Sequence, residues 1–398
     1  MGKLSDRIQR ISESQTIAMA RKSRELKAQG IDIISLSLGE PDFPTPDIIK
    51  EAAKKAIDEN FSYYTHVSGY LELREAVCKK FKRDNGLEYT ADEIVVSTGA
   101  KQSIANAVLC LVNPGDEVII PAPFWVSYLE ILKLAEGKAV FIETDVEQDF
   151  KINAQQLENA ITPKTRVLMM SSPCNPTGSV YSKEELKALA DVIVKYPELY
   201  IISDEIYEHI NFCGGHQSFA QFDFIKDRVI TINGVSKGFS MTGWRGGIMA
   251  APKWIAQACD KIQGQFTSAT SSITQKAMHK AMELDYETYI KPMRDAFLKR
   301  RDLVLAMMKD IPGLKCNVPQ GAFYVYPEVS AFIGKSYQGT KINNATDLSL
   351  FLLEHSHLAL VPGAAFGEDR YLRISYAASE EVLRKAMTRL KEGLAKLS

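Results

Sequence analysis

Lys237 and Arg245 lie eight residues apart, in a glycine-containing segment that follows an apolar run and has the sequence SKGFSMTGWR. A lysine amine can form a Schiff base with an aldehyde, and a guanidinium nearby can hold a phosphate group. The pair therefore indicates a site for pyridoxal 5'-phosphate (PLP), held covalently through its aldehyde and ionically through its phosphate. For Arg245 alone, an ordinary surface ion pair is the alternative.

A strand–turn–helix pattern offers a second contact for the phosphate. The sequence STGAKQ places small residues at Gly99 and Ala100, just before an apolar helical stretch. Backbone N–H groups at the start of such a helix can approach an anion, and the helix dipole favours negative charge there. A plain helix cap without a ligand would show the same sequence pattern. The segment therefore indicates a phosphate site only in combination with Arg245.

A carboxylate follows the apolar run at 200–203, where it is costly to bury without a partner. Asp204 could pair with a protonated pyridine nitrogen, which would keep the ring an electron sink. Tyr207 lies three residues later and, on a first helical turn, would share a face with Asp204 and reach the ring hydroxyl. The alternative is an N-cap aspartate followed by a core tyrosine.

Two further turns follow apolar runs and carry side chains suited to a flat ring. Asn175 lies in SPCNPTG, where two prolines and a glycine fix its amide within reach of the ring hydroxyl. Trp125 follows the segment PAPF and could stack on the ring. A structural Asx turn and a core tryptophan are the separate alternatives. The recurrence of such residues after successive strands makes coincidence a poor explanation.

Apolar runs that alternate with helical patterns predict the elements that carry these residues. We expect buried strands at residues 94–97, 117–120, 167–170, 200–203, 229–232 and 247–250. We expect helices at residues 100–111 and 183–196. This alternation is typical of an α/β fold with a mainly parallel sheet covered on both faces. Ligands bind at the carboxyl ends of the strands in such sheets, which is where the candidate residues fall.

The pattern changes near Tyr286, and the remaining chain indicates a smaller α+β domain. A long charged helix is expected at 291–309 and a strand at 321–326, while the N-terminal segment 4–30 is expected to be helical and to pack beside them. The predicted division is a large domain, 48–285, and a small domain formed by 1–47 plus 286–398. We expect a continuous helix to join the two domains.

Composition excludes several classes of protein. The 398 residues exceed one simple core, and a formal net charge of −1 provides no field that favours nucleic acid or an anionic membrane. No apolar run reaches the roughly 18 residues that span a bilayer, and the N-terminus lacks an apolar signal core. Six scattered cysteines form no CxxC and six histidines form no HExxH, so we expect reduced thiols, no metal and a cytoplasmic protein.

Taken together, these motifs resemble those of class I aminotransferases of PLP fold type I, over essentially the whole chain. The resemblance rests on GEPDF at 39–43, YYT at 63–65, NPTG at 175–178, SDEIY at 203–207, SK with TGWR at 236–245, and LRISY at 372–376. It implies a large PLP domain with a mainly parallel seven-stranded sheet in three αβα layers, plus a smaller α+β domain.

The resemblance implies a role for each residue around the cofactor ring. Lys237 would form the Schiff base and move the proton, and Asp204 would pair with the pyridine nitrogen. Tyr207 and Asn175 would bind the ring hydroxyl, and Trp125 would stack on the ring.

The phosphate would be bound by Arg245, by the backbone of Gly99, Ala100 and Lys101, and by Tyr64 from the partner subunit of a homodimer. Many relatives also carry a serine three residues before the lysine. Here that position is Gly234, and Ser236 would supply the hydroxyl instead. Cys174 stands where many relatives have asparagine and, as a small thiol, is not expected to be catalytic.

At the substrate end, Arg373 and Gly39 would bind the α-carboxylate, beside Trp125 and Asn175. The subgroup resembles bacterial aspartate aminotransferases of type Ib, in which a lysine just after the phosphate turn meets the distal carboxylate. Lys101 matches that lysine, although a solvated lysine is the alternative.

The expected reaction is L-aspartate + 2-oxoglutarate = oxaloacetate + L-glutamate, through a ping-pong mechanism. The same scaffold also supports aromatic, prephenate or kynurenine aminotransferases and a cysteine-S-conjugate β-lyase, which remain alternatives. A PLP-binding regulator without turnover is the alternative outside enzymes.

Overall fold

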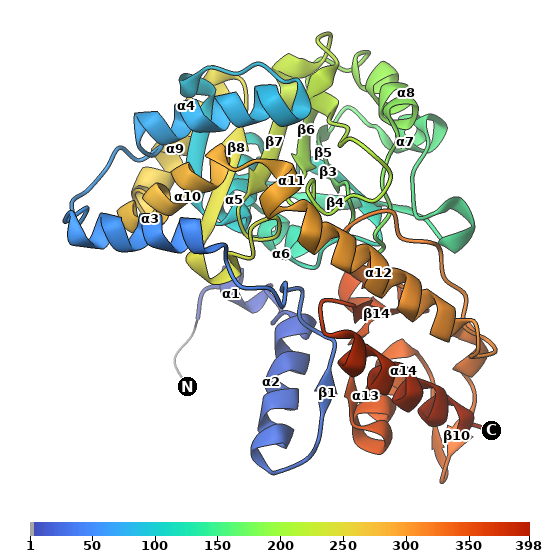
Figure 1. The fold of residues 1–398 in the computed structure, drawn as a ribbon. Helices are drawn as coiled ribbons and strands as arrows, with labels where there is room; N and C mark the ends of the chain where they lie inside the picture. The colour runs from blue at the N-terminus through green and yellow to red at the C-terminus, as the bar shows by residue number, and fades with distance from the viewer. Residues whose placement is uncertain (1–3) are drawn as a thin grey trace.

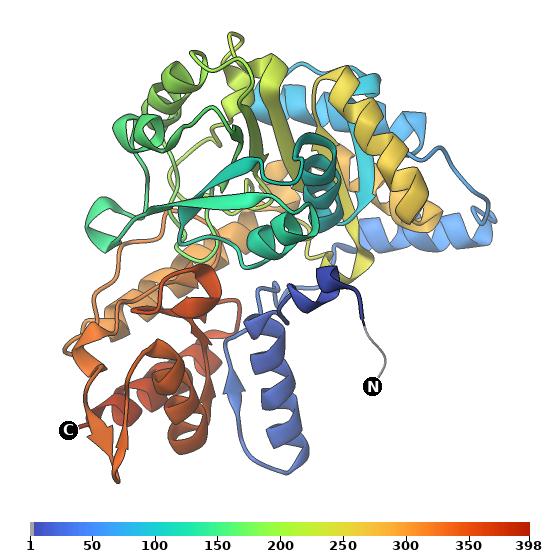
Figure 2. The ribbon, with the colours of Figure 1, turned by 180° about the vertical axis from the view of Figure 1, so that it is seen from behind.

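The computed structural model describes residues 4–398, and it confirms the predicted α/β architecture (Figures 1 and 2). A large body built on one sheet occupies the upper part of Figure 1, and below it the N-terminal residues 15–35 lie beside the C-terminal part of the chain. Among these residues no helix has the length and apolar character needed to cross a membrane.

The sheet has seven strands in the order β2-β8-β7-β6-β5-β3-β4. Their bounds are β2 Ile94–Thr98, β3 Glu117–Ala122, β4 Lys138–Glu143, β5 Thr165–Ser171, β6 Tyr200–Asp204, β7 Val229–Gly234 and β8 Gly246–Ala250. All six predicted strands are present, each within two residues of its expected ends. Strand β4 was not predicted, because it lies at the sheet edge and most of its residues are not buried.

Strand β8 runs antiparallel to both of its neighbours, whereas every other adjacent pair is parallel. The N-terminal end of β8 therefore lies at the edge where the parallel strands end. Thr98 pairs with Gly246, and Gly234 pairs with Gly247. This reversal brings Arg245, which precedes β8, to the same edge as residues that follow β2 and β7.

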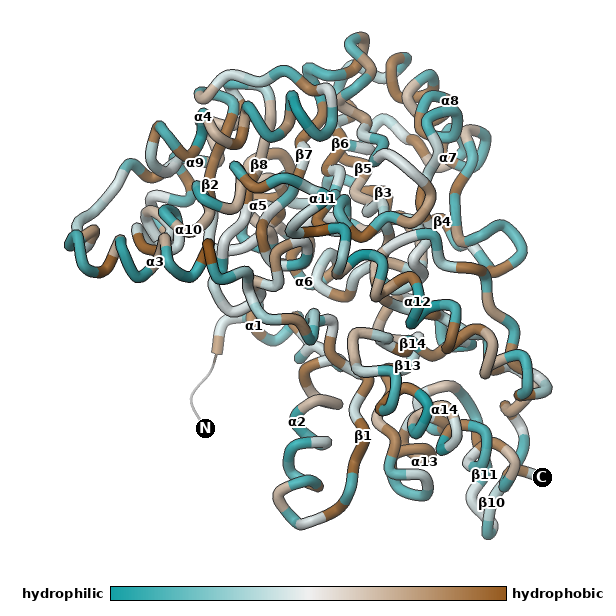
Figure 3. The backbone as a smooth tube through the Cα atoms, viewed as in Figure 1, coloured by the Kyte–Doolittle hydropathy of each residue, from teal (hydrophilic) through white to brown (hydrophobic). Residues whose placement is uncertain are grey.

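Side chains on the strands alternate between two apolar cores, so helices cover both faces of the sheet. On one face, Ile202 and its neighbours pack with helices α5 (Ala100–Leu111), α6 (Ser127–Leu134) and α9 (Lys253–Phe266). On the other face, Ile201 packs in a core with helices α3 (Asp47–Asp58), α4 (Leu71–Lys80), α7 (Ala154–Ala160), α8 (Lys183–Ile193) and α10 (Ser272–Glu283). The expected three αβα layers are therefore present. Figure 3 shows hydrophobic residues along the strands between these layers.

The lower group of elements combines both ends of the chain. Strand β1 (Ile34–Ser35) pairs with β12 (Leu358–Ala359), and a three-stranded antiparallel sheet has the order β13-β14-β9. The other elements are α2 Gln15–Ala28, α12 Lys291–Met308, β9 Tyr324–Val325, α13 Ala345–Ser356, β13 Val361–Pro362, β14 Leu372–Ser375 and α14 Glu380–Ala395. One apolar core unites most of them and also takes in Ile206, Tyr207 and Ile210 from the large body. We propose the domain division 48–285 against 1–47 plus 286–398 on this basis.

Three local predictions were wrong. Segment 4–30 is not one helix, because α1 (Asp6–Gln9) and α2 are separated by residues without helical structure. No continuous helix enters the C-terminal part: Leu284 and Asp285 are extended, with ψ of 143° and 145°, and Asp285 caps the short helix α11 (Tyr286–Tyr289) that precedes α12. The strand expected at 321–326 shortens to β9.

Substitution of Ile202 by alanine should destabilise the protein by about 2–5 kcal/mol, because it opens a cavity in the core beneath the central strand. Ile202 is fully buried, whereas Leu350 on α13 is 42% exposed and provides the matched control. Denaturant unfolding of both variants gives the measurement. A loss of under about 1 kcal/mol for Ile202→Ala would contradict the packing described here.

Candidate active site

A cavity of about 290 Å³ opens at the carboxyl edge of the large sheet, between the two parts of the molecule. Eleven of the thirteen residues predicted for the site line it: Gly39, Ala100, Lys101, Trp125, Asn175, Asp204, Tyr207, Ser236, Lys237, Arg245 and Arg373. Gly99 adjoins the lining through Arg245. Tyr64 is 97% exposed on this chain and lies outside the lining, so its action in a partner's site stays a prediction.

Lys237 follows β7 and extends into the cavity towards the N-terminal segment. Its Nζ donates a hydrogen bond of 2.6 Å to the carbonyl oxygen of Gly39. Burial lowers the pKa of Lys237 to about 8, and the positive charges of Arg373 and Arg245 act in the same direction. About a tenth of this lysine is therefore a free amine at pH 7, far more than for an ordinary lysine, and a nucleophile or a base requires that form.

Asp204 is the last residue of β6, and its carboxylate is buried. It accepts hydrogen bonds from Tyr128 Oη at 2.7 Å and from the backbone N–H of Ile206 at 3.3 Å. Burial raises the pKa of Asp204 to about 6, because its ionised form has lost water. A cation placed in the cavity beside this carboxylate would restore the ionised form.

Tyr207 stands in a hydrogen-bonded turn, not in the first turn of a helix as predicted. Both it and Asp204 nevertheless line the cavity. The Tyr207 hydroxyl lies 2.7 Å from the hydroxyl of Tyr324 on β9, and the two rings form a T-shaped contact. The turn therefore joins the large sheet to the smaller one at the cavity wall.

Arg373 on β14 is a buried guanidinium that lies over the rings of Tyr324 and Phe366 and donates hydrogen bonds only to neutral acceptors. It donates to Asn175 Oδ1 at 2.9 Å and to the carbonyl oxygen of Ser37 at 2.5 Å, and its Nε is buried with no hydrogen-bond partner. Within residues 4–398 no carboxylate lies within ion-pair distance of it. Burial accordingly lowers the pKa of Arg373. A buried charge of this kind is costly, so the site is suited to an anionic ligand.

The cradle predicted for the phosphate is formed by a turn and an arginine from neighbouring strands. Gly99 has a φ of +83°, and a Cβ atom there would lie 2.3 Å from Nη2 of Arg245. Glycine is therefore required both by the backbone conformation and by the approach of the guanidinium. Arg245 Nη1 donates to the carbonyl oxygen of Thr242 at 2.9 Å, which holds the side chain beside the start of α5.

Lys101 in the first turn of α5 lies across the cavity mouth. Its Nζ is 5.1 Å from the centre of the Trp125 ring, in a cation–π contact. Partial burial, and then the charge of Arg245, lower the pKa of Lys101. This ammonium also has no acidic side chain within ion-pair distance in the described part of the chain, so a second anionic group could bind here.

Two glycines permit close backbone contacts at the site. A Cβ atom on Gly39 would lie 2.0 Å from Tyr324 Oη, so only glycine fits between that ring and Lys237. A Cβ atom on Gly234 would lie 2.8 Å from the carbonyl oxygen of Gly246. The absence of a serine at position 234 therefore follows from the close packing of β7 on β8, whereas Ser236 lines the cavity.

Sequence reasoning missed several residues at the site. Tyr128 lies behind the cavity lining and acts through its hydrogen bond to Asp204. It follows Trp125 by three residues, and the spacing argument used for Tyr207 could have found it. Tyr324 comes from a strand that was predicted but not assigned to the site. Thr16 and Ile17 on α2 also line the cavity, and no chemical signal in their segment marks them.

Comparisons with known proteins agree with this geometry. The family model described as aminotransferase class I and II matches residues 31–390. The chain is 47% identical to an aspartate/prephenate aminotransferase of Cereibacter sphaeroides, over 100% of both chains. It superposes on the crystal structure of an aspartate aminotransferase from Rhizobium meliloti with a TM-score of 0.96 and 40% identity, covering 100% of both chains. The Thermus thermophilus aspartate aminotransferase with maleate gives a TM-score of 0.93 and 39% identity, over 99% of this chain and 100% of that one.

The amine of Lys237 should titrate near pH 8 in protein prepared without added cofactor, because burial favours its neutral form. The free amine should predominate above that pH, whereas an ordinary lysine changes near pH 10.4. The pH dependence of acylation at Lys237, followed by mass spectrometry, gives the midpoint. Lys54 on α3 is the control, because its pKa is raised by the hydrogen bond that its Nζ donates to Glu51. A Lys237 midpoint near pH 10 would contradict the buried environment.

Proposed function

Because the chain belongs to the class I and II aminotransferases, we propose that it transfers the amino group of L-aspartate to 2-oxoglutarate, with PLP as its cofactor. The observation that carries the proposal is the buried guanidinium of Arg373, which faces the same cavity as Lys237 and Asp204 and has no carboxylate partner in residues 4–398. An amino acid brings the missing carboxylate next to the reactive amine.

The residues of the cavity fit PLP at three points. The amine of Lys237 suits its aldehyde, and the buried carboxylate of Asp204 suits a protonated ring nitrogen. The cradle of Gly99, Ala100 and Arg245 suits its phosphate. When bound, PLP supplies an aldehyde for the amino group and a ring that accepts electron density from the substrate Cα.

The chain's own groups do the remaining work. Lys237, with a pKa of about 8, can take the proton from the substrate Cα. The same amine can then donate the proton to the carbon that carried the PLP aldehyde. Tyr128 and the backbone N–H of Ile206 hold the Asp204 carboxylate in place. Asn175, fixed by its hydrogen bond to Arg373, couples the position of the substrate carboxylate to the ring side of the cavity.

A dicarboxylate would use both unpaired cations. Arg373 would bind the α-carboxylate with its two Nη atoms and free Nε, and Lys101 would bind the distal carboxylate. Two anchors at opposite ends orient the Cα–H bond towards Lys237, which lowers the entropic part of the barrier. That the Thermus thermophilus neighbour carries maleate, a dicarboxylate, supports this choice.

Prephenate is a second candidate amino-group acceptor. It also carries two carboxylates, so the same pair of cations would suit it. The printed name of the Cereibacter sphaeroides relative includes this activity.

We further propose a cytoplasmic homodimer in which Tyr64, almost fully exposed on one chain, reaches the phosphate in the partner's site.

The purified protein should show a visible absorption band of bound PLP that shifts on addition of L-aspartate and returns with 2-oxoglutarate. Lys237→Ala should lower kcat by at least about 10³-fold, because the nucleophile and the base are lost together. Lys54→Ala, an exposed lysine on α3, is the control and should be unaffected. Full turnover by Lys237→Ala, or no band after PLP is added, would overturn the proposal.

Lys101→Ser should raise the KM for L-aspartate by about 10–100-fold, because one charge-assisted contact of about 1.5–3 kcal/mol is lost. The KM for tyrosine, which has no distal carboxylate, should change far less. Lys187→Ser on the outer helix α8 provides the control. Steady-state kinetics with both amino acids give the two KM values. An equal rise in the KM for aspartate and for tyrosine would show that Lys101 does not determine substrate specificity.

A further inference from the structure

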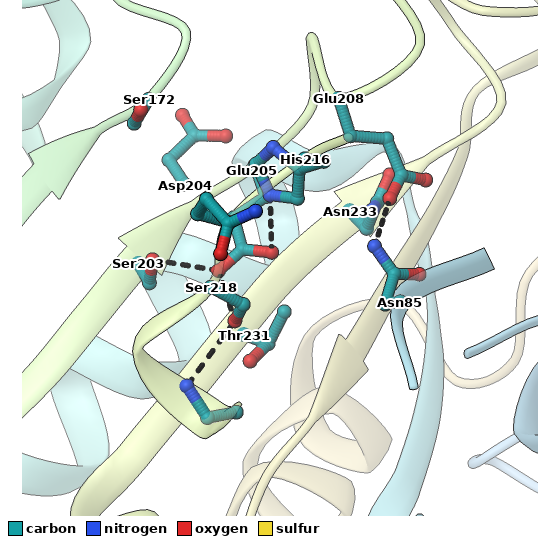
Figure 4. Close-up of polar contacts among 12 residues, drawn as sticks. Asn85, Ser172, Ser203, Asp204, Glu205, Glu208, His216, Ser218, Thr231 and Asn233 are labelled. Atoms are coloured by element: carbon teal, nitrogen blue, oxygen red, sulfur yellow. Dashed lines mark hydrogen bonds and ion pairs between the residues drawn. The ribbon is translucent and has the colours of Figure 1, made fainter. Parts of the chain in front are cut away.

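The turn that presents Asp204 and Tyr207 to the cavity has a rear face on which two other carboxylates are buried (Figure 4). Glu205 and Glu208 are 1% and 6% exposed. Side chains alternate along β6, so Asp204 lies on the side of Tyr128 and α6, and Ser203 and Glu205 lie on the opposite side. None of the chemistry derived above uses the two glutamates.

Glu205 accepts hydrogen bonds from three side chains. Ser203 Oγ and Ser218 Oγ donate to Oε1 at 2.8 and 2.7 Å, and His216 Nε2 lies 2.8 Å from Oε2. Its backbone N–H also donates to the carbonyl oxygen of Ile232 on β7 at 2.8 Å. The buried carboxylate thus ties the end of β6 to the loop at 216–218, while the backbone N–H of the same residue ties it to β7.

Glu208 is held by the end of α4. Lys80 Nζ forms a buried ion pair with Glu208 Oε1, and Asn85 Nδ2 donates to Oε2 at 2.8 Å. Lys80 also donates to Asn85 Oδ1 at 2.8 Å, across the π-helical segment Phe81–Asn85. Burial alone would raise the pKa of Glu208, but the charge of Lys80 above all lowers it, so the net shift favours the Glu208 carboxylate.

The turn itself has little regular structure to hold it. After β6 ends at Asp204, backbone hydrogen bonds within it run only from Glu208 N–H to Glu205 at 2.9 Å and from Ile210 N–H to Tyr207 at 2.8 Å. Buried ion pairs rarely stabilise a fold beyond what apolar residues would, so their presence here needs another reason. The hydrogen bonds of such groups are directional, so they fix the position of the backbone more precisely than apolar contacts do.

We propose that Glu205 and Glu208 are positioning residues, which hold the turn from behind and so fix Asp204 and Tyr207 against the cofactor. We call them, with Lys80, Asn85, Ser203, His216 and Ser218, the rear anchor. The assignment rests on the proposed function, because Asp204 and Tyr207 matter only if PLP binds between them. A catalytic group displaced by about 1 Å can cost on the order of 10²-fold in rate, so the anchor acts on turnover without touching substrate.

The decisive variant is Glu205→Gln, which keeps the shape of the side chain but replaces one acceptor oxygen by a donor nitrogen. Titration of the apo-protein with PLP should give a Kd raised by roughly tenfold, and the visible circular dichroism per bound PLP should fall as the ring loses its fixed orientation. The kcat should fall by a similar factor, while the KM for L-aspartate changes less than about twofold because Arg373 and Lys101 are untouched. Glu208→Gln should act in the same direction.

Arg228→Met is the matched control. Arg228 is buried just before β7, at the end of the strands away from the cavity, where it donates to the carbonyl oxygens of Ile193 and Tyr196. The Arg228→Met substitution should lower the Tm without changing the Kd for PLP or the dichroism. Ser218→Ala removes a single donor to Glu205 and gives a milder variant should Glu205→Gln fail to fold.

The outcomes separate the two proposals. A wild-type protein that binds no PLP refutes the proposed function itself. If the wild type binds PLP and the anchor variants keep its Kd and dichroism, or change them no more than Arg228→Met does at an equal loss of Tm, only the rear anchor is refuted. Weaker binding and weaker dichroism confined to the anchor variants support it.

Discussion

The burial of three ionisable groups around one cavity is the constraint on which this structure depends. Lys237, Asp204 and Arg373 have each lost water, and no described residue supplies the counter-charge that would balance Arg373. Their pKa values are displaced in the directions that desolvation dictates, which gives a reactive amine, a carboxylate that favours a cation, and a guanidinium that favours an anion. The three-layer core holds Lys237 and Asp204 in place, and the apolar core of the smaller part, which contains Leu372 and Ile374, holds Arg373.

The reversed strand β8 allows Arg245 to lie at the same end of the sheet as the other groups of the cavity. Parallel strands deliver loops to one edge only from their carboxyl ends, so residues before a strand would normally lie at the far edge. Inserting one antiparallel strand between β2 and β7 returns the chain to the functional edge, and Arg245 meets Gly99 there. Pairs of glycines where these strands touch allow the close approach.

Much of this arrangement could be predicted from the sequence, because its signals are local. The six core strands are continuous apolar runs, and the resemblance to class I aminotransferases is confirmed by the family match. Strand β4 escaped because an edge strand half exposed to solvent lacks such a run. The break between α1 and α2 escaped because Arg10 and Ser12 are held by the distant Glu136 and Glu130. The extended Leu284–Asp285 link did carry a local signal, the N-cap Asp285, which the prediction did not use. Tyr324 and most of the rear anchor were missed because their contacts join distant segments and leave no spacing in the sequence, whereas the position of Tyr128 three residues after Trp125 was a signal that the prediction did not use.

The hydrogen bond from Arg373 to the carbonyl oxygen of Ser37 spans 336 positions of the chain. On a ribosome, which makes proteins from the N-terminus, the segment around Ser37 is finished long before its partner exists. The large sheet can form while the last strands are still being made, but the substrate pocket cannot. Activity in this protein therefore appears only after Arg373 has been synthesised, and a nascent chain that has already built its main core is still an incomplete enzyme.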